Sequence, residues 1–74
     1  MTVDEFLAAF AAEIRVCAPS SEQAAELLEV ASIAAHASQR MAAPLACWMG
    51  GASGLPIAEL LGAAQRAATD PDAA

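Results

Sequence analysis

The feature that most constrains this fold is an apolar pattern with the period of an α-helix, which runs along almost the whole chain. In the first segment the pattern begins directly after Thr2, which forms a capping box with Glu5. It ends at Ala18-Pro19. On a helical wheel its apolar side chains fall on one stripe, which consists of Val3, Phe6, Leu7, Phe10, Ile14 and Cys17. No segment predicts a strand. The pattern therefore predicts an all-α fold.

Helix signals divide the next part of the chain into two more helices. Ser20 and Gln23 form a second capping box, and the helix that follows is expected from about residue 22 to about residue 40. A third helix begins near Ala43-Pro44, because proline suits the first helical turn. We expect this helix to be short and to stop at Gly50-Gly51.

Pro56 opens a fourth helix after the turn sequence GASG. Its apolar stripe consists of Ile57, Leu60, Leu61, Ala64 and Ala68. No repeat or domain boundary interrupts the chain, so residues 1–68 are expected to form a single helical domain and residues 69–74 a flexible tail. The sequence as a whole predicts a compact bundle of four short helices.

The core of this bundle is expected to be thin. A chain of 74 residues buries only about 60% of the surface that its unfolded form exposes, and much of the apolar composition here is alanine. The inner face of the second helix is predicted as Leu27, Val30, Ala31, Ala34, Ser38 and Met41. Leu45, Trp48 and Met49 are expected to close the core. A core of this kind rarely supplies more than about 3 to 5 kcal/mol, so we expect further burial against a partner.

The charge balance argues against two classes of partner. The net charge is −6, lysine is absent, and the basic side chains are Arg15, Arg40 and Arg66. Nucleic acids and anionic membrane surfaces bind basic patches, so neither is expected as a partner. The acidic N-terminal sequence MTVDEF differs from a secretory signal, which favours a cytoplasmic location. Membrane insertion is not expected, because prolines and glycines interrupt the uncharged stretch over residues 41–58.

The two cysteines, Cys17 and Cys47, are too few for a disulfide scaffold and too scattered for a zinc site. In a reducing compartment we expect each to be a small buried apolar side chain. A bridge between the two is the alternative interpretation.

His36 is the only histidine, and imidazole titrates near neutral pH. Catalysis would need a positioned nucleophile and an orienting carboxylate, but Glu29 is two turns away and neither cysteine is local. On the predicted second helix, His36 shares an outer stripe with Ile33 and Arg40 at spacings of three and four residues. A plain solvated surface and a docking edge for a partner protein or an anionic group both stay open. Our partner-binding prediction is therefore Ile33, His36 and Arg40.

Other kinds of site lack the residues that they need. The sequence GGASGLP before the fourth helix is neither a Walker motif nor a dinucleotide fingerprint, so a plain turn is favoured over an anion cradle. One histidine and scattered carboxylates provide no metal cage. We predict that the protein is not an enzyme, with no catalytic residues, no metal site and no directly bound cofactor.

The stretch over residues 27–54 resembles a small bacterial helical family of uncharacterised function, and the opening MTVDEFLAAFAAEI resembles the first helix of that family. The matching positions in this sequence are Ala35, His36, Arg40, Ala42, Ala43, Pro44 and Leu45. Met41 differs, because that family usually has proline at this position. Members are encoded beside, or fused to, molybdenum-cofactor guanylyltransferases and molybdenum-dependent oxidoreductases. The resemblance implies a role in the same system.

A weaker resemblance links the chain to the small delta subunit of cytoplasmic NAD-dependent formate dehydrogenases. The matching positions are Ile33, Ala34, His36, Arg40, Met41, Gly50, Gly51, Gly54 and Leu55, with shifted spacing. The aromatic run that follows the histidine in the delta subunit is missing here.

Both resemblances imply a non-catalytic accessory or small structural subunit of a molybdenum-cofactor-dependent oxidoreductase system, acting by protein–protein contact. The expected partner is a large molybdoenzyme subunit or a molybdenum-cofactor biosynthesis protein, and the cofactor itself is expected in that partner. His36 and Arg40 would then face a partner protein or an anionic group such as a pterin phosphate. Two alternatives are a molybdenum-cofactor maturation or binding chaperone, and a self-associating helical module that forms a homo-oligomer.

Overall fold

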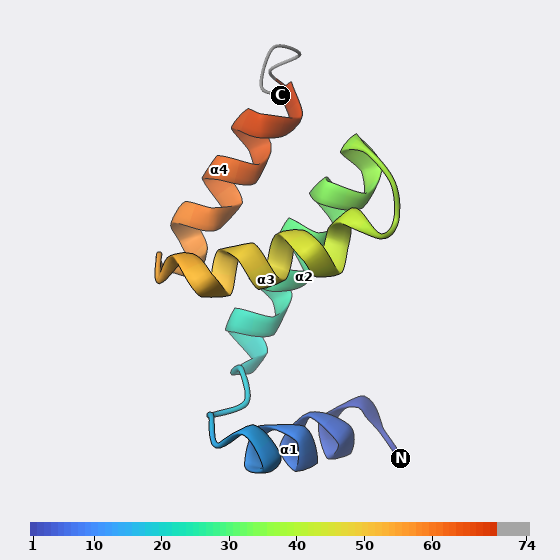
Figure 1. The fold of residues 1–74 in the computed structure, drawn as a ribbon, viewed down its shortest axis with the longest axis vertical. Helices are drawn as coiled ribbons and strands as arrows, with labels where there is room; N and C mark the ends of the chain where they lie inside the picture. Colours follow the sequence, from blue (N-terminus) through green and yellow to red (C-terminus); the bar gives the residue numbers. More distant parts are fainter. Residues whose placement is uncertain (70–74) are drawn as a thin grey trace.

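The computed structural model describes residues 1–69 and contains four α-helices in that range, without a strand. Along the chain they are α1 (Val3–Ile14), α2 (Ser21–Ala37), α3 (Ala42–Ser53) and α4 (Ile57–Thr69), as Figure 1 shows. The predicted all-α fold of four helices is confirmed. From residue 70 on, the predicted flexible tail lies outside the described residues.

Both predicted capping boxes are present and fix the starts of α1 and α2. The Thr2 N–H donates to Glu5 Oε1 at 2.8 Å, and the Glu5 N–H donates to Thr2 Oγ1 at 3.1 Å. Ser20 and Gln23 make the same pair of bonds at 2.9 and 3.1 Å. Each box satisfies two N–H groups that the helix itself leaves without a partner.

The first two helices end earlier than predicted. Arg15 adopts the left-handed conformation after α1, with φ 60° and ψ 47°. The Val16 N–H then donates to the Ala11 carbonyl at 3.0 Å and closes the last turn. The second helix ends at Ala37, so Arg40 belongs to the turn that leads into α3.

The third helix is longer than predicted, and the expected stop at Gly50-Gly51 is wrong. The helix continues through both glycines to Ser53. Gly54 ends it, because Gly54 is the glycine in this segment that adopts the left-handed conformation, with φ 73°. The Ser53 hydroxyl donates to the Gly50 carbonyl at 2.6 Å and accepts the Leu55 N–H at 3.1 Å, which fixes the exit of the chain.

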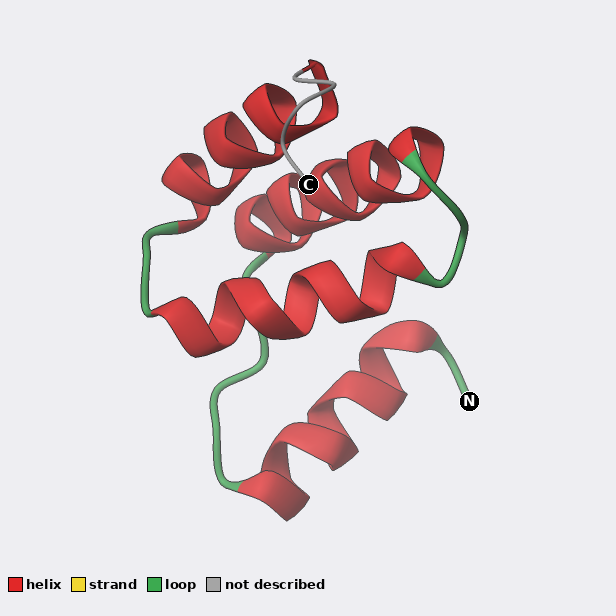
Figure 2. Cartoon of the chain, turned by 45° about the horizontal axis from the view of Figure 1, so that its top comes forward, coloured by secondary structure: helices red, strands yellow, loops and turns green. Residues whose placement is uncertain are grey.

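The helices α2, α3 and α4 pack together, and α1 stands apart. The long α2 packs against both α3 and α4, whereas α1 makes almost no contact with the other helices. Figure 2 shows α2, α3 and α4 as one group, with α1 below them. The core lies along α2, where Val30 is only 5% exposed.

Gly50 of α3 lies against Leu60 of α4. A Cβ atom added to Gly50 would lie 2.9 Å from Leu60 Cδ1, so the missing side chain lets the two helices meet. Gly51 has nothing within 4 Å of such an atom. The two neighbouring glycines therefore differ in what they contribute to packing.

Replacing these glycines by alanine should change stability unequally. Gly51→Ala should raise the free energy of unfolding by up to about 1 kcal/mol, because alanine loses less backbone entropy in a helix. Gly50→Ala should raise the free energy of unfolding by less, because Leu60 has to move away from the new methyl group. Chemical denaturation at one fixed protein concentration measures both changes. Equal gains would contradict a tight contact between Gly50 and Leu60.

The start of α1 should respond to pH, whereas the start of α2 should not. The pKa of Glu5 is lowered from its ordinary value, first by its hydrogen bond with the Thr2 backbone and then by the Thr2 hydroxyl. A lowered pKa in the folded state means that this contribution to stability is present above the unfolded-state pKa and is lost as pH falls through the folded-state pKa. Gln23 takes the same place in α2 and does not titrate in this range.

An NMR titration of the backbone amides checks this difference. The Thr2 and Glu5 amide signals should move together as the Glu5 carboxyl is protonated, while the Ser20 and Gln23 signals stay in place. Glu5→Gln should abolish the movement and keep the cap, because glutamine can accept the same hydrogen bond. A Glu5 pKa at or above that of an unstructured glutamate would contradict the capping box in solution.

Candidate interaction surface

The three residues predicted to bind a partner do not form one helical stripe. Ile33 is half-buried and lines a hollow beside α3 and α4, so it faces the helix group instead of solvent. His36 is exposed in the last turn of α2. Arg40 is exposed but lies beyond the end of this helix, which breaks the predicted spacing. The predicted stripe is wrong in its geometry, while a role for His36 and Arg40 in binding stays a prediction.

His36 pairs with its own helix. Its Nδ1 atom lies 2.7 Å from the Ser32 carbonyl oxygen and 3.2 Å from Ser32 Oγ. A carbonyl oxygen can only accept, so Nδ1 carries the hydrogen at the shorter contact and cannot take a proton from the Ser32 hydroxyl. This pair therefore does not have the arrangement of a nucleophile and its base.

Cys17 and Cys47 are both less buried than predicted. Cys17 is exposed, whereas Cys47 is half-buried on α3, and both are free thiols. Burial was wrong for Cys17 because α1 ends before it, so Cys17 lies in the connection to α2 and not on the α1 stripe. The alternative disulfide between the two is not formed.

The predicted closing of the core by Leu45, Trp48 and Met49 is wrong. These side chains are 62%, 74% and 66% exposed. The third helix turns its small residues toward the other helices instead, and those half-buried residues are Ala42, Ala43, Ala46, Cys47 and Gly50. A stripe of small side chains allows closer helix packing than bulky ones, so the bulky residues of α3 lie on its outer side.

The apolar face of α1 is also uncovered. Phe6, Phe10 and Ile14 each expose about half of their surface, at 51%, 50% and 51%. The two phenyl rings stack on each other with centroids 5.8 Å apart, so they shield one another but no second layer lies over them. Sequence periodicity identified this stripe, but periodicity does not show what covers it.

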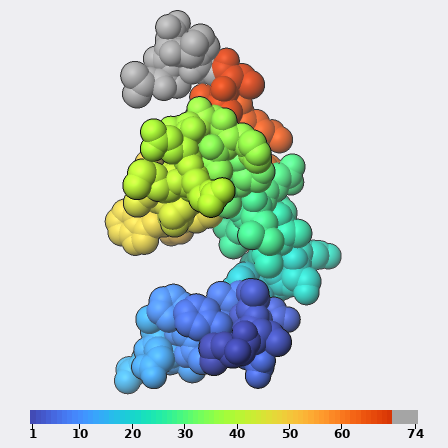
Figure 3. Space-filling model, turned by 90° about the vertical axis from the view of Figure 1, so that its right-hand side faces the viewer, coloured from blue at the N-terminus to red at the C-terminus, as the bar shows by residue number. Residues whose placement is uncertain are grey.

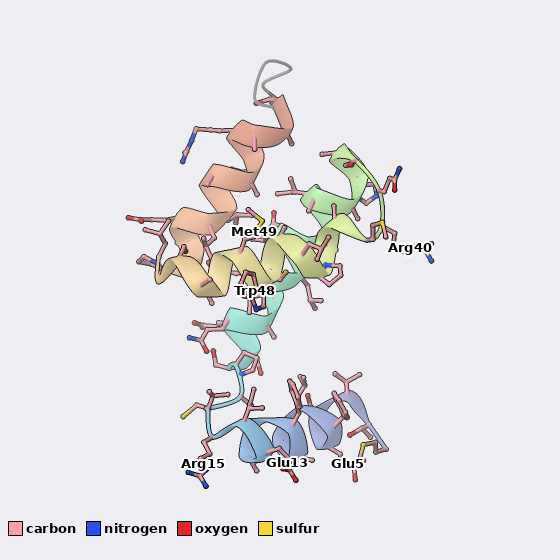
Figure 4. The ribbon with its side chains drawn as sticks, in the orientation of Figure 1. Glu5, Glu13, Arg15, Arg40, Trp48 and Met49 are labelled. Atoms are coloured by element: carbon pink, nitrogen blue, oxygen red, sulfur yellow. The ribbon has the colours of Figure 1, made fainter. Side chains whose placement is uncertain are left out.

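These two faces flank an open space. Figure 3 shows a hollow between α1, in blue, and the yellow part of α3. In Figure 4, Trp48 lies on the side of α3 turned toward α1, and Glu5 and Arg15 lie on the far side of α1. We define the α1/α3 apolar surface as five of the exposed apolar residues of the two helices, namely Phe6, Phe10, Ile14, Leu45 and Trp48. It carries no charged side chain, so it suits contact with another apolar surface.

A second hollow lies within the helix group. It has a volume of about 280 Å³ between α2, α3 and α4, and its walls come from apolar or small side chains such as Leu27, Ala64 and Leu60. Sites for small molecules usually add a few convergent polar groups, which this one lacks apart from Ser53 and Cys47. We interpret it as an underfilled junction of three helices.

Within residues 1–69, no cluster of three or more potential metal-ligating side chains occurs. Among the helices over the same residues, none has the length and apolar content to cross a membrane.

A protein-family model described as Domain of unknown function (DUF6457) matches residues 1–74, which is the whole chain. No curated protein and no solved structure matches this chain.

Filling the internal hollow should stabilise the helix group. Ala64 lines both this hollow and the smaller one beside Ile33, so Ala64→Leu should place three more carbon atoms in existing space. The expected gain is about 1 to 2 kcal/mol, because each buried methylene contributes about 0.8 kcal/mol. Ala58→Leu is the matched control on α4, since Ala58 is exposed and lines neither hollow. Thermal unfolding that is unchanged by Ala64→Leu would contradict the hollow.

Proposed function

The chain belongs to the family described as Domain of unknown function (DUF6457), and we propose that it is a non-catalytic helical subunit that acts by protein–protein contact. The observation that carries the proposal is the α1/α3 apolar surface. Monomeric soluble proteins rarely expose large contiguous apolar patches, and larger ones commonly mark interaction sites. The aromatic residues Phe6, Phe10 and Trp48 belong to the types enriched at the centres of protein interfaces.

The polar groups support a role in contact more than in catalysis. His36 is held by Ser32 of its own helix, and the internal hollow is lined without a charged side chain. The lowered pKa of Glu5 comes from its hydrogen bonds with Thr2 in a helix cap. Active sites usually shift the pKa of a group in a cleft toward its catalytic task, and the Glu5 shift has a structural cause instead.

We propose the molybdenum-cofactor system as the place of action because of the sequence resemblance. The partner is then a large molybdoenzyme subunit or a molybdenum-cofactor biosynthesis protein, and the cofactor belongs to that partner. The acidic outer side of α1 would face solvent or a basic rim on the partner, since like charges across an interface weaken binding.

An affinity-tagged chain, expressed in its native host, should carry a molybdenum-containing protein through purification in a fixed ratio. Mass spectrometry identifies that protein, and metal analysis of the eluate measures its molybdenum. Trp48→Ser or Phe10→Ser should lower the recovery at least about tenfold, because aromatic residues at interface centres contribute most of the affinity. Glu5→Gln is the control, since it changes the outer side of α1 and keeps the cap.

Circular dichroism separates loss of contact from loss of folding. Trp48 is 74% exposed, so its removal should leave the helix content of the chain unchanged. Recovery of the tagged chain with no molybdenum protein would contradict the proposed partner. Arg40→Ala in the same experiment tests the predicted contribution of Arg40, which should lower recovery without changing helix content.

A further inference from the structure

Contacts within residues 1–69 contribute little to the stability of the short α1, in which Ala11 is the one buried residue. This helix has 12 residues, and isolated helices of that length are marginal in water. Helices of this size in proteins are stabilised mainly by packing an apolar face. The face of α1 that holds Phe6 and Phe10 has almost no contact with the other three helices. A stable α1 therefore needs a covering surface that residues 1–69 do not supply.

The exposed area is large enough for a stable association. The chain exposes 5814 Å², whereas a folded monomer of 7.5 kDa exposes roughly 4,200 Å². The difference exceeds roughly 1,000 Å² per chain, while a stable interface needs about 800 Å² from each partner. One interface of ordinary size would bring the exposed surface into the range of folded proteins.

The shape of the surface fits a copy of itself. Each chain offers both an apolar helix, α1, and a space beside that helix which is flanked by α3 (Figure 3). A twofold rotation can place α1 of each chain in the space of the other, and then every contact occurs twice. Two α1 helices and two α3 helices would enclose Phe6, Phe10 and Trp48 from both chains.

The charges allow this approach although each chain carries a net charge of −6. Glu5 lies on the far side of α1 in Figure 4, away from the space beside α3. Glu13 borders the phenylalanine face, because it follows Phe10 by three residues in the same helix. In a pair of chains both carboxylates can stay in water at the periphery, where salt and solvent screen them.

We propose that the α1/α3 apolar surface binds a second copy of this chain, with α1 of each copy seated between α1 and α3 of the other. This inference rests on the proposed function: the second copy covers the α1/α3 apolar surface, and the paired chains, not the monomer, present the contact for the molybdenum partner. Variants that weaken the pair therefore also lower recovery of that partner. The α2–α3 turn with Arg40 lies outside this surface and leaves a separate edge for a heterologous partner.

Sedimentation velocity of the purified chain, from micromolar to submillimolar concentration, tests the proposal. The expected result is a species of twice the chain mass that dissociates on dilution. Trp48 is the only tryptophan, so its fluorescence reports the same event. Its emission should shift to longer wavelength, and its quenching by acrylamide should rise, at the concentration where the dimer dissociates.

Matched variants assign the dimer to this surface. Phe10→Ser and Phe6→Ala should each weaken dimerisation roughly tenfold or more, and Glu5→Gln, which lies on the far side of α1 and keeps the cap, should leave it unchanged. Circular dichroism at high concentration identifies any variant that has unfolded. Because both phenylalanines are half-exposed, at least one variant is expected to keep α2, α3 and α4 folded.

Two results would overturn the inference. One is a monomer at every concentration with Trp48 open to acrylamide, and the other is a dimer that neither phenylalanine variant weakens. The proposed function fails separately. If the chain is a monomer but still co-purifies with a molybdenum protein, only the dimer is ruled out. If the chain is a dimer but co-purifies with no molybdenum protein, only the proposed partner is ruled out.

Discussion

Close packing through small side chains is the constraint on which the rest of this structure depends. The helices α2 and α3 meet through residues such as Ala46 and Cys47, and Gly50 lets Leu60 approach the α3 backbone. Such contacts bring helices near each other but bury little apolar area, and alanine contributes least of the apolar side chains. The helix group consequently holds Val30 as its one large buried side chain within residues 1–69, and an underfilled hollow lies beside it.

This constraint also decides where the bulky side chains lie. Once α3 turns its small residues toward α2 and α4, the opposite side of the helix has to carry Leu45 and Trp48. The same holds for α1, whose aromatic residues have no counterpart among the described residues, 1–69. The bulky residues that an ordinary domain uses in its core are here available to a partner. A thin core and a large apolar surface are therefore two results of one distribution of side-chain sizes.

The sequence predicted the helices better than their packing. Capping boxes at Thr2 and Ser20 are local hydrogen-bonding patterns, so their residues alone reveal them. Helix ends were harder, because Arg15 adopts a left-handed conformation that usually belongs to glycine, while Gly50 serves packing and not termination. Burial of Trp48 was predicted from its size and proved wrong, because a stripe of small residues competes for the same interface. That stripe, at intervals of three and four residues in α3, is the signal that could have revealed the exposed face. The predicted edge of Ile33, His36 and Arg40 required α2 to continue for two turns after Ile33. The helix ends at Ala37 instead, so Arg40 does not share a helical face with Ile33 and His36.

Exposed apolar area of this size favours a permanent association over a transient one. Transient partners separate into water, so their interfaces are no more apolar than the rest of a protein surface, whereas obligate interfaces resemble a core cut in half. The α1/α3 apolar surface has the second character, because it joins stacked aromatic rings to a tryptophan without a charged residue among them. The net charge of −6 also favours one specific association. Repulsion between the acidic outer faces opposes unspecific aggregation, and the uncharged residues of the apolar surface still allow one specific contact. In the proposed assembly this alanine-rich chain completes its fold on contact with its partner, and α1 is the part of the fold that this contact completes.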